Sequence, residues 1–261
     1  MIRTLSYGYR PSLSEQQRHF YEEECDPEFE TTRPRYCGEL YTYLIEHKFR
    51  TACEVLSLDL AGRTLLEICA GSGMMSEKFA RAGVIVTATD FSASAIIRAR
   101  ERARRYNFTA AFAVADAERL PFPDRSYDLV AVHDGLHHLE HPKQAVREMA
   151  RIARQAVLIM DPADAALTAA AVKLGIAQRF EEAGNEVKRL EPFVLEEILR
   201  HCGLRTIRWR RTMMYYPHRP GRWFRLLGTP PLSAAVRHVF QASNLIFGRW
   251  GNKLTLAALR T

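Results

Sequence analysis

The sequence TLLEICAGSG at residues 64–73 decides the fold of this chain. An apolar run typical of a buried strand leads into two glycines, and a helix-forming stretch starts at Met74. Glycines between a strand and a helix allow the backbone to approach a ligand bound at the helix N-terminus. We therefore expect a strand, a ligand-binding turn and a helix in direct succession.

The same pattern repeats further along the chain. Five short apolar runs are expected to be strands: Thr64–Ile68, Val84–Ala88, Ala110–Ala115, Leu129–His133 and Ala156–Met160. The helices expected between them are Met74–Ala82, Ala93–Tyr106 and Pro142–Ala153. Strands that alternate with helices indicate βαβ units, and runs with little polar alternation indicate strands covered on both faces. The chain is therefore predicted to be an α/β protein with a doubly wound, mostly parallel sheet.

The remaining sequence is expected to extend and cover this sheet. Leu204–Tyr216 and Leu254–Leu259 are predicted to be the sixth and seventh strands, and Val194–Cys202 a helix that ends at Gly203. Residues 1–60 are predicted to form an N-terminal helical lid, with helices over Glu15–Glu24 and Tyr36–Ser57 broken near Pro27 and Pro34. Residues 61–261 then form one domain with cap insertions at about 163–190 and 217–252.

Composition favours a cytoplasmic globular protein. The chain has 261 residues, of which 47% are hydrophobic, enough for one full core. No apolar run reaches the roughly 18 residues that cross a bilayer, and the N-terminal residues lack the apolar region of a signal peptide. The five cysteines are scattered and form no CxxC pair, which is typical of reduced thiols. The net charge of +7 permits acidic partners without selecting one.

Acidic residues follow the second and third predicted strands. Asp90 ends the second strand, and Asp116-Ala117-Glu118 follows the third. In open α/β sheets, ligands bind at the carboxyl ends of the strands. A carboxylate at Asp90 can accept both hydroxyls of a ribose, and the Asp116–Glu118 segment would lie near an adenine amino group. These positions indicate a site for an adenosine-containing ligand.

The stretch from Leu65 to Asp161 resembles class I S-adenosylmethionine-dependent methyltransferases of the type that includes ubiquinone/menaquinone-biosynthesis and natural-product enzymes. The turn after the first strand is similar to the family's glycine-rich motif, although Cys69 stands where glycine is frequent. The resemblance implies a Rossmann-like methyltransferase fold and S-adenosylmethionine as cofactor. The cofactor-binding residues it implies are Glu67, Cys69, Ala70, Gly71, Gly73, Asp90, Phe91, Ser92, Asp116, Ala117, Glu118 and His133.

An NAD(P)-dependent oxidoreductase is the main alternative, because it also uses a glycine turn and an acidic residue on ribose. However, its third glycine would fall at Ser76 in this chain. A charged Glu67 also suits a cationic ligand better than a pyrophosphate. A non-catalytic protein that only binds S-adenosylmethionine is a further alternative.

Methyl transfer requires an acceptor aligned with the sulfonium methyl group, and a weakly acidic acceptor also needs a base. The resemblance implies His137 as this base, oriented by Asp161, with His138 beside it. The other interpretation is that these histidines cap and pack their turn. A metal site built from the histidines and Asp134 is conceivable by residue type, but we expect none. We expect a small-molecule acceptor, with oxygen favoured as the methylated atom and a sugar, natural product or lipid-linked compound as the class.

The C-terminal part of the chain interleaves arginines with aromatic residues between Arg205 and Arg225. The favoured interpretation is a strand with arginines on its solvated face and a packed cap helix. The alternative is a peripheral contact with membrane or with a lipid-linked substrate, whereas nucleic acid is not favoured. The five arginines between Arg98 and Arg105 are likewise expected on a solvated helix face. The sequence leaves the oligomeric state open.

Overall fold

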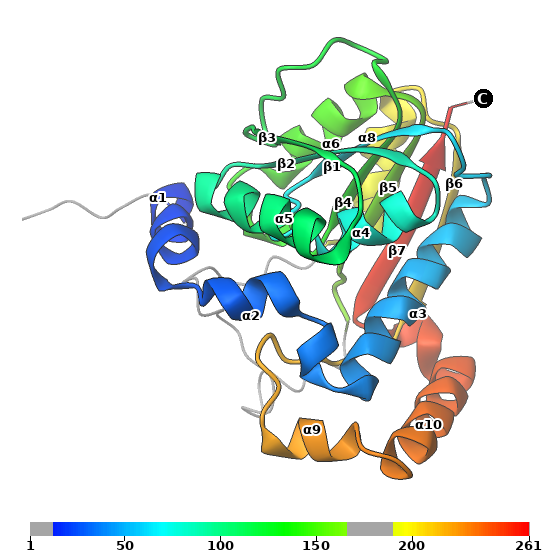
Figure 1. The fold of residues 1–261 in the computed structure, drawn as a ribbon. Helices are drawn as coiled ribbons and strands as arrows, with labels where there is room; N and C mark the ends of the chain where they lie inside the picture. Colours follow the sequence, from blue (N-terminus) through cyan, green and yellow to red (C-terminus); the bar gives the residue numbers. More distant parts are fainter. Residues whose placement is uncertain (1–12, 166–189, 261) are drawn as a thin grey trace, which may run out of the picture.

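The computed structural model describes residues 13–165 and 190–260, and its centre is one seven-stranded sheet (Figure 1). The strand order is β3-β2-β1-β4-β5-β7-β6, and only β7 runs antiparallel to its neighbours. The strands are β1 Thr64–Ile68, β2 Ile85–Asp90, β3 Ala111–Val114, β4 Tyr127–His133, β5 Ala153–Pro162, β6 Thr206–Thr212 and β7 Lys253–Leu259. The predicted doubly wound, mostly parallel α/β fold is confirmed.

Helices cover both faces of the sheet, as Figure 1 shows. One face packs against α6 (Pro142–Ile152) and α8 (Pro192–His201), and the other against α3 (Glu39–Leu56) and α4 (Met74–Arg81). Alternate strand residues face opposite sides, so Leu66 and Ile68 belong to the first core and Leu65 to the second. The apolar character of β1 follows directly, because both of its faces are buried.

The N-terminal region contains more than a lid. Before α3 it forms α1 (Leu13–His19), a π-helical turn η1 (Phe20–Glu24), α2 (Pro27–Thr32) and a 3₁₀ turn η2 (Arg35–Cys37). Pro27 does not break a helix but begins α2, where the side chain of Asp26 accepts hydrogen bonds from two backbone amides.

Helix α3 belongs to the sheet domain by its packing. Its residues Ala52, Val55 and Leu56 are buried in the same core as Leu65 and Leu158. The predicted lid boundary at residue 60 does not match this packing, because amphipathic helical spacing does not show which surface a helix covers. The part of the N-terminal region that lies outside the two cores of the sheet ends before α3; we call it, residues 13–37, the N-terminal lid after its predicted role.

Between β6 and β7 the chain forms α9 (Arg222–Leu227), α10 (Leu232–Phe247) and a 3₁₀ turn η4 (Gly248–Trp250). These elements fall within the expected insertion at 217–252, and α10 packs against α3. The other expected insertion, 163–190, lies mainly outside the described residues. Within the described part of the chain, no helix has both the length and the apolar composition to cross a bilayer.

Candidate active site

A cavity of about 440 Å³ lies at the edge of the sheet where the parallel strands end. The segments after β1, β2, β4 and β5 meet there, because parallel strands point their carboxyl ends to one edge. The antiparallel strand β7 starts at this edge, since Lys253 pairs with Pro162 at the end of β5. The pairing of β7 with β5 therefore places Lys253, a residue from near the C-terminus, in the cavity lining.

The structure brings most of the expected site residues together. The residues Cys69, Ala70, Gly71, Asp90, Phe91, His133, His137 and His138 line the cavity. The residues Glu67, Gly73, Ser92, Asp116, Ala117, Glu118 and Asp161 lie outside its lining. The first set comes from the turns that directly follow β1, β2 and β4, whereas most of the second set supports these turns or lies on a neighbouring loop.

The turn after β1 is held open by backbone conformation and by Asp90. Cys69, Gly71 and Gly73 have φ angles of +51°, +54° and +74°, in the region that favours glycine. Cys69 therefore adopts the conformation of the glycine that it replaces. One oxygen of Asp90 accepts the Gly71 N–H at 2.8 Å and the other accepts the Ser92 N–H at 3.0 Å. Burial raises the pKa of Asp90, so its carboxylate gains from a further hydrogen-bond donor in the cavity.

Glu67 has a different position from the one its charge suggested. Its side chain is buried beneath the turn, where it accepts a hydrogen bond from the Ser76 hydroxyl, and burial raises its pKa to about 8. The carboxyl group is therefore largely protonated at neutral pH and is absent from the cavity lining. The expected attraction between a charged Glu67 and a cationic ligand finds no support in this geometry.

The acidic residues after β3 organise two loops. Asp116 is exposed and its Oδ1 accepts the Glu118 N–H at 2.9 Å, while Glu118 Oε1 accepts the His141 N–H at 2.7 Å. Glu118 thus ties the loop after β3 to the start of α6. Ala117 is buried in the core beside this loop.

His137 and Asp161 form a buried pair at the ends of β4 and β5. Asp161 Oδ1 lies 2.7 Å from His137 Nδ1, and the carboxylate also accepts the backbone N–H groups of Gly135, Leu136 and His137. Burial alone would raise the pKa of Asp161, but His137 and these amides outweigh it and hold the pKa below its usual value. An ionised Asp161 places the hydrogen of the ring on Nδ1, which leaves Nε2 as the acceptor.

Asp134 pairs with two lysines that the sequence did not identify, and we call these three residues the lysine pole; Asp134 and Lys253 line the cavity, whereas Lys48 lies outside its lining. Its Oδ1 lies 2.8 Å from Lys48 Nζ and 3.2 Å from Lys253 Nζ, and its Oδ2 accepts a hydrogen bond from the Tyr216 hydroxyl. Burial lowers the pKa of Lys48 to about 8. Burial would raise the pKa of Asp134, but the two lysines hold it well below its usual range.

Next to this pole, His133 is neutral, because burial and the nearby Lys48 lower its pKa to about 3. The tyrosine keeps its proton as well, since burial and Asp134 raise the pKa of Tyr216 well above its usual value. Two ammonium groups thus face one carboxylate, and the surplus positive charge favours an anionic group in the cavity.

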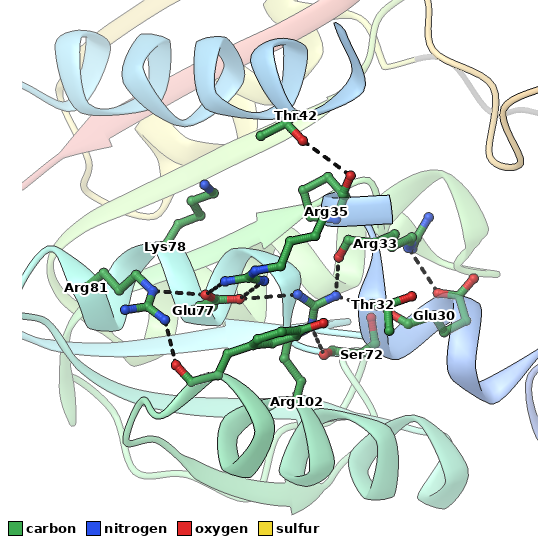
Figure 2. A network of polar contacts seen from close by, with 12 residues as sticks. Glu30, Thr32, Arg33, Arg35, Thr42, Ser72, Glu77, Lys78, Arg81 and Arg102 are labelled. Atoms are coloured by element: carbon green, nitrogen blue, oxygen red, sulfur yellow. Dashed lines mark hydrogen bonds and ion pairs between the residues drawn. The ribbon is translucent and has the colours of Figure 1, made fainter. Parts of the chain in front are cut away.

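Figure 2 shows a polar network that joins the N-terminal lid to the turn after β1. Its centre is Arg102 of α5 (Ala93–Tyr106), whose side chain is fully buried. Its guanidinium donates to the carbonyl oxygens of Ser72 at 2.9 Å and Glu30 at 3.1 Å, to that of Arg33, and to Glu77 Oε2 at 3.2 Å. Arg102 therefore touches the turn after β1, α4 and the lid at once.

Glu77 completes this network from α4. Its carboxylate also accepts two hydrogen bonds from Arg35 of the lid and one from Arg81 (Figure 2). The expectation of a solvated face for the α5 arginines is thus wrong for Arg102 and for Arg98, which are both buried. The spacing of Ala95, Ala99 and Arg102 places this arginine on the buried stripe of α5, a signal that helical periodicity could have revealed.

A second cavity, of about 560 Å³, adjoins the first. It is lined by apolar residues of α3, α9 and α10, such as Leu44, Phe224 and Phe240. The two cavities share Tyr215 and Pro217 in their linings. A polar cavity and an apolar one therefore meet at the segment after β6.

Part of this site lies in a region of the chain that is similar to known proteins. Residues 66–160 match the family model of a methyltransferase domain. A demethylmenaquinone methyltransferase of Renibacterium salmoninarum is 38% identical over 93 residues, which are 36% of this chain and 38% of that protein. A ubiquinone/menaquinone biosynthesis C-methyltransferase of Hahella chejuensis is 38% identical over 100 residues, which are 36% of this chain and 40% of that protein. The chain thus spans about two fifths of the length of these relatives.

Solved structures share the fold over a larger part of the chain. Magnesium protoporphyrin IX methyltransferase of Synechocystis PCC 6803, solved with bound SAH, matches with a TM-score of 0.63 and 17% identity over 96% of this chain and 100% of that one. The YcgJ protein of Bacillus subtilis matches with a TM-score of 0.59 and 18% identity over 82% of this chain and 98% of that one. At this identity the likeness concerns the fold alone.

Replacing Arg102 with Met tests the network. Because the change leaves Glu77 without one buried partner and Ser72 without its donor, we expect the free energy of unfolding in urea to fall by roughly 3–5 kcal/mol. Arg104→Met is the control on the same helix, since Arg104 is exposed and pairs with Glu101, and it should leave the free energy of unfolding almost unchanged. Equal losses for the two variants would contradict the assigned role of Arg102.

The raised pKa of Glu67 predicts that the stability of the folded protein depends on pH. Its pKa is about 8 in the folded protein and near 4.5 when unfolded, so the folded state binds more protons between these values and loses stability as the pH rises. The difference in unfolding free energy between the wild type and Glu67→Gln should therefore decrease steadily from pH 4.5 to pH 8. Urea unfolding of both proteins across this range measures it, and a constant difference would show that Glu67 titrates normally.

Proposed function

We propose that this chain, whose residues 66–160 are a methyltransferase domain of the class I S-adenosylmethionine-dependent type, transfers the methyl group of S-adenosylmethionine to a small-molecule acceptor. The observation that carries the proposal is the turn after β1, with Asp90 bonded to it and facing the cavity. The ribose hydroxyls of the cofactor would bind Asp90, and the backbone of Cys69–Gly71 would lie against the amino acid part. Once bound, the cofactor supplies a methyl group on a positively charged sulfur.

The lid contributes to this site through the network around Arg102. Glu30 and Arg33 line the same cavity as Asp90, and Arg102 bonds the backbone carbonyls of both residues. Residues before α3 would therefore cover the bound cofactor and exclude water from the reacting groups. The loop of Asp116 and Glu118 stands outside the cavity lining. We propose that this loop contacts the adenine only at the rim of the cavity.

His137 is proposed as the general base. Asp161 bonds its Nδ1, so Nε2 is the ring nitrogen that can take up a proton, and the ring lines the cavity. A hydroxyl of the acceptor would give its proton to Nε2, and the anion so formed would take the methyl group from the cofactor, which would leave as S-adenosylhomocysteine. The surplus positive charge of Lys48 and Lys253 around Asp134 stabilises the acceptor anion. His138, which lies against His137 with ring centres 4.0 Å apart, positions that ring.

The acceptor is proposed to be an amphiphilic compound with an acidic hydroxyl group. The apolar cavity beside Tyr215 accommodates a hydrocarbon part, while the lysine pole favours the anion of a phenol or enol. This favours a lipid-linked acceptor over a sugar. The preference for oxygen finds no support in the comparisons, and the C-methyltransferase among the similar proteins favours carbon. A phenolate or enolate is nucleophilic at oxygen and at carbon. The same base therefore serves O-methylation and C-methylation.

Two experiments test this function. Isothermal titration with S-adenosylhomocysteine should show binding, and NADH should show none; the opposite pattern would establish the oxidoreductase alternative. Incubation with methyl-labelled S-adenosylmethionine and a panel of phenols, with and without an alkyl chain, plus a sugar control, should label the alkylated phenols most. Cofactor binding without labelling of any acceptor would favour a non-catalytic binding protein.

Replacing Asp90 with Ala removes the proposed ribose contact. The loss of a charge-assisted hydrogen-bonded pair should weaken S-adenosylhomocysteine binding by roughly 1.5–3 kcal/mol. Asp124→Ala is the matched control, because this exposed carboxylate pairs with Arg151 and stands outside the cavity lining. Wild-type affinity in the Asp90 variant, measured by titration, would remove Asp90 from the site.

Replacing His137 with Gln tests the base. Methyl transfer to the best acceptor of the panel should slow by about 100-fold or more, the usual contribution of a general base. The affinity for S-adenosylhomocysteine should stay within about twofold. His141→Gln, an exposed histidine on the same segment, should behave as wild type. An unchanged rate in His137→Gln would assign the histidine a packing role only.

A further inference from the structure

The outer face of α10 is apolar where a surface helix is normally polar. Inward, Val236 and Phe240 pack against α3. Outward, Val239, Leu245 and Ile246 are exposed to 68%, 89% and 62%. Single exposed apolar residues are ordinary, but a helix that is apolar on both faces requires a second partner.

Neighbouring elements enlarge this surface. Helix α9 adds Trp223 and Leu226, which are 80% and 47% exposed, and η4 adds Trp250 at 45%. In Figure 1, α9 and α10 lie together beyond α3, at the end of the molecule farthest from β3. We call this surface, formed by the exposed apolar side chains of residues 222–250, the cap face. It contains tryptophans, which favour the boundary between lipid and water.

Within residues 222–250 the chain carries arginines and no acidic residue, while Glu39 of α3 pairs with Arg237 of α10. No aspartate or glutamate follows Glu197 in the sequence, whereas eleven arginines and one lysine do. Arg222, Arg225 and Arg249 are exposed on the cap, and within residues 13–165 and 190–260 none of the three has an ion-pair partner. The guanidinium carbon of Arg249 lies 3.8 Å from the centre of the Trp250 ring, so the two side chains stack. Cations next to exposed tryptophans and leucines complement an anionic lipid surface.

We propose that the cap face docks on the surface of an anionic lipid bilayer. Trp223, Leu245 and Ile246 enter the boundary between headgroups and acyl chains, and the arginines pair with lipid phosphates. The interaction is peripheral, and it does not depend on the proposed methyl transfer. The apolar cavity is lined by Trp223 and Leu227 of this face, so docking places that cavity next to the lipid.

The lack of carboxylates favours lipid over a second copy of the chain. A symmetric dimer through this face would bring Arg222 and Arg225 close to their own copies or to the arginines nearby, with no acidic residue of the cap to pair with them. An anionic bilayer supplies phosphates at high density instead. Salt should therefore weaken the docking, because it screens exposed charges.

Co-sedimentation of the full chain with vesicles tests the proposal. The protein should pellet with phosphatidylcholine vesicles that contain phosphatidylglycerol, and much less with phosphatidylcholine alone. The double variants Leu245→Ser/Ile246→Ser and Arg222→Ser/Arg225→Ser should each bind at least about tenfold more weakly. The controls are Ile97→Ser, an exposed isoleucine on α5, and Arg205→Ser/Arg208→Ser, exposed arginines near β6. Both controls should bind as wild type.

Three results would overturn the proposal: no pelleting with anionic vesicles, equal pelleting of the cap variants and the wild type, or equal binding to neutral and anionic vesicles. Light scattering of the lipid-free protein gives a further check. A dimer that Leu245→Ser/Ile246→Ser converts to a monomer would assign the cap face to contact between copies. Thermal unfolding of each variant should match the wild type, since the replaced side chains are exposed.

Discussion

The buried guanidinium of Arg102 connects the parts of the molecule that make the site. It lies on α5 and bonds the turn after β1, the carboxylate of Glu77 and the lid backbone at Glu30 and Arg33. A buried cation is stable only with such partners, because removal from water costs several kcal/mol per ion. The same hydrogen bonds also fix the turn and the lid, because the guanidinium of Arg102 needs acceptors from both segments.

Two carboxylates at the ends of β4 and β5 have distinct tasks set by their neighbours. Asp161 accepts backbone amides and the ring of His137, and so fixes the turn after β4 while it orients one imidazole nitrogen. Asp134 accepts Tyr216 and two lysines, and so collects positive charge near that ring. If His137 is the base, as proposed, the surplus positive charge beside it would help to form and hold an acceptor anion.

The sequence predicted the sheet well because buried parallel strands appear as short apolar runs, and β1 was placed at Thr64–Ile68, as found. It predicted the meeting of His137 with Asp161 only through family resemblance. Lys48 and Lys253 could not be predicted, since α3 and β7 reach the cavity through topology and not through proximity in sequence. Glu67 illustrates the same limit: its residue type suggested charge, whereas its burial favours the protonated form.

A crystal structure of the complex with S-adenosylhomocysteine tests the central claim most directly. Both ribose hydroxyls should bind the carboxylate of Asp90. The amino acid part should lie along the turn at residues 69–73, and the thioether sulfur should face the cavity between His137 and Asp134. A ligand bound elsewhere, or one whose ribose lies away from Asp90, would contradict the claim that this turn is the cofactor site.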